Sequence, residues 1–286
     1  MRKVLLLISL VFAAISCGQR KQDNQSQKLL GVPEYMVEQH IVDYLHKAQV
    51  QSLATGRRKM EKLFDDIVLE EQADSTRHAY LRLTELVSKY LYDPNSYLRD
   101  EDLYLPFLKK MIDSPYTSED IRPAYVYEAQ MCALNPRESV AADFLFRTVS
   151  GRNIRLSDIK SDYVILFFSN PGCEACKEIV ETIKSAEFAD VMQEEGTLTV
   201  LNVYIDQDLK AWRDYLSYYP KTWINGYDPN YIIREDVIYN VRAIPSVYLL
   251  GPGKTVVLKD ADIIRVLDTL FNIYQQEYES QTQTMG

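Results

Sequence analysis

The chain divides into two stretches with different hydrophobic patterns. Between residues 32 and 135, apolar residues recur every three or four positions, as at Val37, Ile41 and Leu45. This spacing places them on one face of a helix. The same spacing recurs over residues 60–68, 80–91, 103–112 and 121–134. We therefore predict a small all-α domain over residues 32–135, a bundle of about five helices.

After residue 135, short apolar runs alternate with helical patterns, which is typical of a layered α/β domain. We place this domain at residues 136–278 and treat 279–286 as a flexible tail. The expected strands are 143–147, 163–168, 197–205, 247–250 and 255–258, and the expected helices follow residue 173 and cover 209–219 and 262–274.

A pair of cysteines, Cys173 and Cys176, follows the apolar run 163–168 and a turn-forming Ser-Asn-Pro-Gly segment. The residues after the pair have helical spacing, so Cys173 should begin a helix. Unpaired backbone N–H groups and the helix dipole stabilise a thiolate there. Cys176 lies one turn further on the same face, so the two sulfurs can close a disulfide. This pattern favours redox chemistry.

The pair has two other interpretations, a zinc site and a structural disulfide. Structural zinc needs four ligands, typically a second cysteine pair or a pair of histidines. The remaining cysteines are Cys17 and Cys132, and none of the three histidines, all upstream of residue 79, forms a ligand pair with them. We therefore expect no metal and no other cofactor. A purely structural disulfide stays open, and Cys132 is expected to be a free, buried cysteine.

The N-terminus indicates export. Two basic residues precede an apolar run over residues 4–15, which has the length of a signal peptide and ends at Ala14-Ile15-Ser16-Cys17. It resembles a bacterial lipoprotein signal, although Ala14 stands where leucine is usual. We expect 1–16 to be the signal peptide, Cys17 to be lipidated and 17–31 to be a flexible tether. An ordinary secretory signal is the alternative. The expected location is the periplasmic face of the bacterial cell envelope, at a membrane through the lipid anchor.

The overall charge excludes one class of partner. The formal net charge is −9, and removal of the signal would take away two cationic residues. A chain this acidic has no electrostatic basis for binding nucleic acid.

The second half resembles the thioredoxin-like superfamily, and within it the TlpA-like, membrane-attached thiol–disulfide oxidoreductases. The matching segments are 142–160, 168–176 and 243–249, where Ile244-Pro245-Ser246 corresponds to the family's cis-proline element. The resemblance covers residues 138–276 and implies an α/β fold with a central mixed sheet flanked by helices. Residues 90–96 and 99–101 resemble a poorly characterised domain found upstream of such modules in exported lipoproteins.

The resemblance implies a function and its residues. Cys173 would exchange with a substrate sulfur and Cys176 would resolve the mixed disulfide, the pair cycling through a redox-active disulfide. Ile244 and Pro245 would bind the substrate strand. The implied partners are cysteine-containing exported proteins and an upstream electron donor or acceptor, and the implied activity is that of a reductase or isomerase.

Three departures from thioredoxin leave one role unassigned. Gly172 stands where thioredoxins carry tryptophan, Glu174-Ala175 replaces Gly-Pro, and Phe167 replaces the buried aspartate. The candidates for the proton acceptor of Cys176 are therefore Glu174 and Glu178. Trp223 could cover the site or pack in the core.

Two rival functions stay open. One is a non-enzymatic envelope binding lipoprotein that uses the thioredoxin-like module as a scaffold. The other is a peroxidase. It is less favoured, because peroxiredoxins carry Thr or Ser at the position that Asn170 occupies here.

Overall fold

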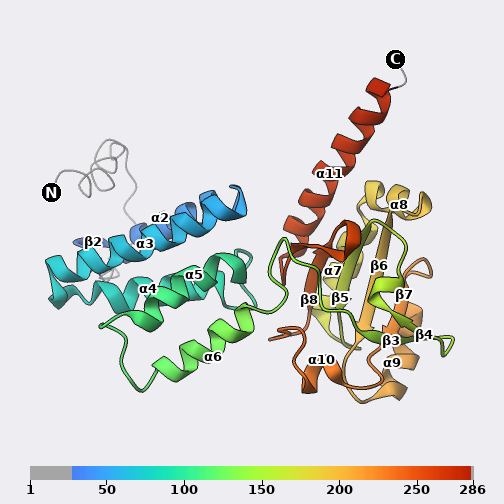
Figure 1. Cartoon of the computed structure of the whole chain (residues 1–286), viewed down its shortest axis with the longest axis horizontal. Coiled ribbons are helices and arrows are strands. Elements are labelled where there is room, and N and C mark those ends of the chain that lie inside the picture. The colour runs from blue at the N-terminus through green and yellow to red at the C-terminus, as the bar shows by residue number, and fades with distance from the viewer. Residues whose placement is uncertain (1–27, 285–286) are drawn as a thin grey trace, which may run out of the picture.

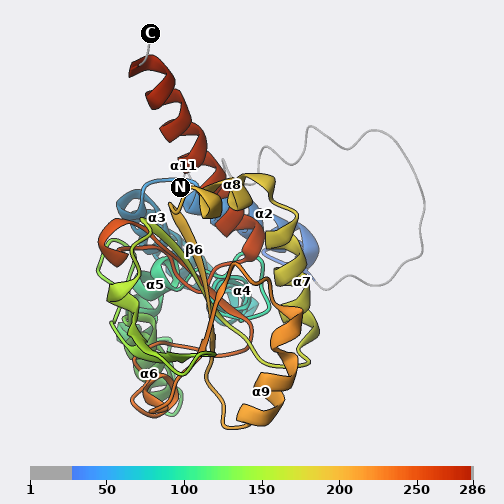
Figure 2. The same ribbon diagram turned by 90° about the vertical axis from the view of Figure 1, so that its right-hand side faces the viewer.

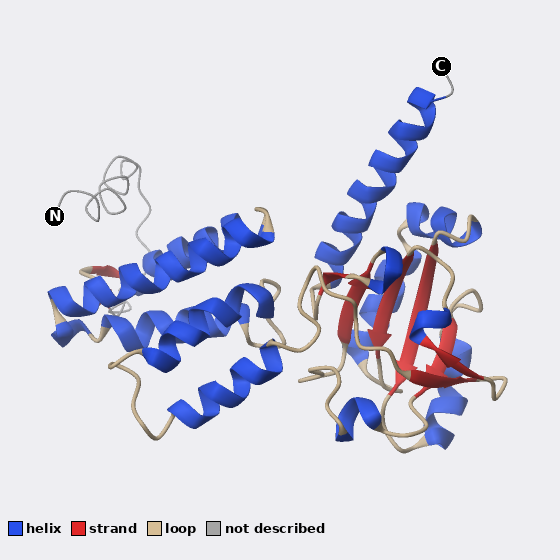
Figure 3. Ribbon diagram, in the orientation of Figure 1, coloured by secondary structure: helices blue, strands red, loops and turns tan. Residues whose placement is uncertain are grey.

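The computed structural model describes residues 28–284, so the predicted signal peptide and Cys17 lie outside the described residues. Figure 1 shows a helical part and an α/β part joined by the segment 133–144. Colouring by secondary structure separates the two parts clearly, with the large sheet confined to the second one (Figure 3).

The helical part is built on the apolar spacing seen in the sequence. Its core is formed by side chains such as Leu45, Met60, Val87 and Phe107, none of which exposes a measurable fraction of its surface. The predicted helices are confirmed. They are α2 (Glu34–Gln49), α3 (Leu53–Ala73), α4 (Ala79–Leu91), α5 (Glu101–Asp113) and α6 (Arg122–Cys132), with the short η1 (Ser75–Arg77) before α4.

The end of the predicted tether belongs to this part of the fold, so the prediction for 17–31 is wrong there. Strand β1 (Lys28–Leu29) pairs with β2 (Val32–Pro33) in an antiparallel hairpin. Leu29 exposes only 1% of its surface and packs in the helical core. Burial of that apolar side chain offsets the cost of ordering the segment.

The α/β part contains a seven-stranded mixed sheet in the order β4-β3-β7-β6-β5-β8-β9. Strands β5, β6 and β7 are parallel, and β3 and β8 run antiparallel to their neighbours β7 and β5. The predicted thioredoxin-like α/β class is thus confirmed. The strands are β3 (Leu145–Thr148), β4 (Asn153–Arg155), β5 (Tyr163–Phe168), β6 (Leu198–Tyr204), β7 (Ile224–Tyr227), β8 (Ser246–Leu250) and β9 (Val256–Leu258).

Strand β5 lies at the centre, and all six of its residues are buried. Ile165 and Phe167 face one core, to which α7 (Glu174–Lys184), α8 (Glu187–Glu194) and α11 (Ile263–Thr284) contribute. Val164, Leu166 and Phe168 face a second core, closed by segment 141–159 and α10 (Ile232–Glu235). Figure 2 shows β6 between α7 and α8 on one side and the green segment that opens this part on the other. A strand covered on both faces needs an unbroken apolar run, which is why this one was predicted with its observed bounds.

Several short elements were not predicted, among them β4, β7, α8 and α10. Strand β7 contains Asn225 and Gly226, residues that disfavour a strand assignment. Gly226 is required by packing, because a Cβ atom there would lie 2.7 Å from the ring of Phe146.

Helix α11 extends further than expected. It continues to Thr284, so residues 279–284, predicted as a flexible tail, are helical. Their polar composition suggested a tail, but no glycine or proline interrupts the sequence between Ile263 and Thr284. Among residues 28–284, no helix is both long and apolar enough to cross a membrane.

Candidate functional site

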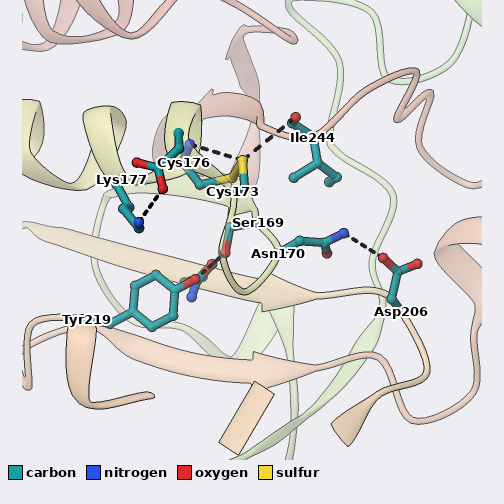
Figure 4. The surroundings of a disulfide bond; sticks show 10 residues. Ser169, Asn170, Cys173, Cys176, Lys177, Asp206, Tyr219 and Ile244 are labelled. Carbon is teal, nitrogen blue, oxygen red and sulfur yellow. Dashed lines mark hydrogen bonds and ion pairs between the residues drawn. A yellow bond between two sulfur atoms is a disulfide. The ribbon is translucent and has the colours of Figure 1, made fainter. Parts of the chain in front are cut away.

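Cys173 and Cys176 form a disulfide at the N-terminus of α7 (Figure 4). Their Cα atoms are 5.2 Å apart. Cys173 occupies the N-cap position, and the backbone nitrogen of Cys176 lies 3.1 Å from Cys173 Sγ. When the pair is reduced, this amide can donate to a Cys173 thiolate, and the helix dipole favours the same charge.

The turn after β5 places the pair at the edge of the sheet. Gly172 has a φ of +73°, a conformation that residues with a Cβ rarely adopt. Asn170 donates to Asp206 at 2.6 Å, and Asp206 also pairs with Arg234 at 2.8 Å, so the turn is tied to the segment that follows β6.

The two cysteines differ in accessibility. Cys176 exposes 2% of its surface and packs in the core that contains Ile179 and Val180, whereas Cys173 is half-buried. An incoming disulfide can therefore reach Cys173 more readily than Cys176.

The structure brings Ile244 to the cysteine pair across 71 residues of sequence. Its carbonyl oxygen lies 4.0 Å from Cys173 Sγ, and the Ile244–Pro245 peptide bond is cis, as the resemblance implied. Figure 4 shows Ile244 beside Cys173. Strand β8 begins two residues after Ile244, at Ser246, and pairs with β5. The main chain of Ile244 thus lies beside the more accessible of the two sulfurs.

Near the turn lies a buried, uncharged polar network that the sequence analysis did not identify. Ser169 Oγ donates to Asn202 Oδ1 at 2.5 Å and lies 2.9 Å from the Tyr219 hydroxyl, and Asn202 donates to Asn225 at 3.0 Å. Burial raises the pKa of Tyr219, so its phenol keeps its proton. One residue in the sequence could have indicated this network. Asn202 is a carboxamide inside the buried run of β6, and a buried amide needs hydrogen-bond partners.

The two candidate proton acceptors lie on the solvent side of α7. Glu174 and Glu178 are both exposed, and Glu174 forms an ion pair with Lys177. The hydrogen bond to Glu174 raises the pKa of Lys177. Because Cys176 faces the core, the structure does not bring either carboxylate together with its sulfur. The fully buried polar groups near the turn are those of the neutral network, whereas the charged Asp206 beside it is partly exposed.

The remaining candidates have structural surroundings. Trp223 is 6% exposed and packs edge-on against Phe167 and face-on against Tyr219, so it belongs to the core. Cys132 is free and buried at the end of α6, and burial raises the pKa of its thiol. Within residues 28–284, no group of three or more His, Cys, Asp or Glu side chains is arranged to hold a metal ion.

Comparison with known families divides the chain as the fold does. Residues 22–131 match a domain of unknown function, DUF5106, and residues 161–256 match a thioredoxin-like family. No curated protein matches the chain significantly.

Among solved structures, the chain is similar to a thioredoxin-like protein from Bacteroides caccae, with 35% identity, 83% of each chain covered and a TM-score of 0.72. It is also similar to the C-terminal domain of an uncharacterized protein from Bacteroides fragilis, with 36% identity over 48% of this chain and 97% of that one, and a TM-score of 0.46. A third similar structure is the thioredoxin domain of a thiol-disulfide oxidoreductase from Bacteroides vulgatus, with 17% identity over 48% of this chain and 97% of that one, and a TM-score of 0.42. The Bacteroides caccae protein thus matches across both parts of the fold.

Proposed function

This chain belongs to the thioredoxin-like family, and we propose that it is a thiol–disulfide oxidoreductase, a reductase or isomerase of cysteines in exported proteins. The observation that carries the proposal is the half-buried Cys173 at the N-terminus of α7, joined to the buried Cys176 and facing the Ile244 carbonyl. A structural disulfide needs neither the accessible sulfur nor the adjacent main-chain acceptor, so this arrangement favours exchange over a scaffold role.

In the reducing direction, the Cys173 thiolate attacks one sulfur of a substrate disulfide. A bond forms between the two sulfurs, and the other substrate sulfur leaves as a thiolate and takes up a proton. Cys176 then loses its proton and attacks Cys173, which breaks the mixed disulfide and releases the second substrate thiol. The substrate gains two electrons, and the pair becomes the disulfide. A dithiol donor upstream would return two electrons to it.

The substrate strand would bind by β-augmentation, with the Ile244 main chain pairing with its backbone and Pro245 setting the shape of the surface. Binding through main-chain groups suits a protein that acts on cysteines in many sequence contexts. The proton acceptor is left to water or to the polar groups at the turn, because Glu174 and Glu178 both face solvent.

The location completes the proposal. A lipid on Cys17 would hold the protein at the periplasmic face of a bacterial membrane, among exported proteins that carry disulfides. In cell fractionation, the wild type should sediment with membranes and Cys17→Ser should move to the soluble fraction. A Cys17→Ser protein that stays fully with membranes would contradict the anchor.

Insulin-type disulfide reduction tests the activity. Cys173→Ser should abolish it, and Cys176→Ser should accumulate mixed disulfides, because the attacking thiol remains while the resolving thiol is gone. Cys132→Ala is the matched control and should exchange at the wild-type rate, since its thiol is buried in the helical part. Trapping by Cys173→Ser but not by Cys176→Ser would reverse the two roles. A wild-type protein that exchanges no disulfide would favour the binding-scaffold alternative.

A further inference from the structure

The loop over residues 236–245, which connects α10 to β8 and carries Ile244, is hydrogen-bonded to the segment 133–144 and to the helical part. Asn135 donates to the carbonyl of Ile238 at 2.7 Å. The Tyr239 hydroxyl donates to the carbonyl of Ala142 at 2.6 Å. Both anchors belong to the segment that joins the helical part to the first strand of the large sheet.

The next attachment is a carboxylate of the helical part. Glu101 lies in the first turn of α5 and exposes 1% of its surface. Its Oε1 accepts from Asn240 at 2.6 Å and lies 3.0 Å from Arg242 Nε. Its Oε2 lies 2.7 Å from Lys259 Nζ. One buried carboxylate therefore holds two residues of the loop.

Arg242 is fixed on its other sides as well. Its Nη2 pairs with Asp260 at 2.9 Å, and its guanidinium lies over the ring of Tyr92, 4.3 Å from the centroid. Tyr92 follows α4 and stacks on Tyr104, so the surface beneath the guanidinium also comes from the helical part. A guanidinium that is only 11% exposed, doubly paired and stacked has little freedom to move.

The fastened residues end two positions before the one that meets the disulfide. Ala243 alone separates Arg242 from Ile244, whose carbonyl oxygen is 4.0 Å from Cys173 Sγ. Two residues span at most about 7 Å of chain, so a displacement at Arg242 reaches Ile244 with little loss.

We propose that Glu101 of the helical domain is a positioning residue of the disulfide site, holding the Ile244 carbonyl against Cys173 through Asn240 and Arg242. This inference rests on the proposed function for its effect on substrate, because Ile244 is the residue that would pair with the substrate strand. It gives the helical domain a direct part in the geometry at the sulfur.

The position of that carbonyl has a chemical consequence. In the reduced protein, its oxygen can accept from a Cys173 thiol, and its negative end disfavours a thiolate. Moving the Ile244 carbonyl away from Cys173 should let the thiolate form at lower pH. A displaced loop should also bind substrate more weakly, although both cysteines are still present.

The test uses Glu101→Gln in the full-length chain, which keeps the shape of the side chain and removes its charge. After reduction, the pH midpoint of Cys173 alkylation by iodoacetamide should fall by about 0.5 pH unit. In insulin reduction, KM should rise about fivefold, with a smaller change in kcat. The alkylation profile does not require disulfide exchange. A wild type without exchange would therefore refute the proposed function while leaving the positioning role measurable.

Asp102→Asn is the matched control. Asp102 is the next residue of α5, is equally buried, and pairs with Arg57 and Arg137 rather than with the loop. It should leave both the midpoint and KM unchanged. An unchanged midpoint in Glu101→Gln, or an equal shift in Asp102→Asn, would overturn the proposal.

Should Glu101→Gln fail to fold, Arg242→Lys carries the test, because lysine keeps the charge but cannot bridge Glu101 and Asp260 through a planar fork. A smaller shift in the same direction supports the proposal, and a wild-type profile overturns it.

Discussion

Two buried polar clusters of the described residues, one at the disulfide turn and one between the helical and α/β parts, are built in different ways. At the turn that carries the disulfide, the buried network of Ser169, Asn202 and Tyr219 is uncharged. Where the helical part meets the α/β part, the cluster is built around buried charges, with the Glu101 and Lys259 side chains each 1% exposed. Buried ion pairs tolerate few alternative arrangements, because an unpaired partner is costly. The charged cluster therefore fixes the geometry of the joint, by which we mean the contact between the helical part and the α/β part. The Cys173 sulfur is instead influenced by dipoles, namely the N-terminus of α7 and the Ile244 carbonyl.

The largest expected effect comes from breaking the charged cluster. Lys259 pairs with Glu101 and donates to the carbonyls of Cys132 and Leu134. Lys259→Met should lower the free energy of unfolding by about 3–5 kcal/mol, because it leaves the buried Glu101 carboxylate and two backbone carbonyls short of a donor. Urea unfolding followed by tryptophan fluorescence measures it.

Lys210→Met is the control for that change. Lys210 forms an ion pair with Asp214 on the surface, where both side chains are mostly exposed. The free energy of unfolding should stay at the wild-type value, because solvent screens an exposed ion pair. If Lys259→Met and Lys210→Met lowered the free energy of unfolding equally, the buried ion pairs at the joint would stabilise the fold no more than exposed ones.

A smaller effect is expected from the neutral network. Ser169→Ala removes a partner from both Asn202 and Tyr219, and should lower the free energy of unfolding by about 1–3 kcal/mol. Ser185→Ala, at the exposed end of α7, should stay within about 0.5 kcal/mol of the wild type. A Ser169→Ala loss as large as that of Lys259→Met would erase the contrast between neutral and charged clusters.

The smallest effect is a loss of folding stability at alkaline pH, and it should be the same for a buried tyrosine of the helical part and one of the α/β part. Burial holds the pKa of Tyr104, in the helical part, and of Tyr239, in the α/β part, well above the ordinary value of 10.0. Above pH 10 the unfolded phenol loses its proton while the folded one keeps it, so stability falls as pH rises. Between pH 10 and 10.5, each such phenol should cost about 0.4 kcal/mol.

Urea unfolding at the two pH values measures that cost. Tyr104→Phe and Tyr239→Phe should each remove one such increment from the pH dependence, whatever their effect at neutral pH. The exposed Tyr127, replaced by phenylalanine, should leave the pH dependence as it is. A wild-type slope in both buried variants would show that these phenols ionise equally in the folded and unfolded states.

The sequence predicted those features whose cause is local. Strand β5 is a continuous apolar run because both of its faces are covered, and the disulfide follows from cysteines one helical turn apart. Residues 279–284 show the limit of the same reasoning, because polar composition does not decide whether a helix continues. Strands β4 and β7 were missed because their pairing partners, rather than their own residues, define them.

The joint between the two parts could not be predicted in this way. Glu101, Arg242 and Lys259 are charged residues, which usually lie on the surface, and more than 100 residues separate the first from the other two. Their burial depends on the folded arrangement of both parts. The same holds for Ser169 and Tyr219, which are 50 residues apart and meet only in the folded chain.

Lys259 also terminates a helix that is not its own. By donating to the carbonyls of Cys132 and Leu134, it supplies to the end of α6 the cap that a helix usually finds in its own sequence. The two halves are therefore poor candidates for exchange between relatives, although separate family patterns describe them. A chimera that joined this helical half to a foreign redox half would leave Glu101 without its cations and α6 without its cap. In any lineage that recombines such modules, Glu101, Arg242 and Lys259 would have to be inherited or replaced together.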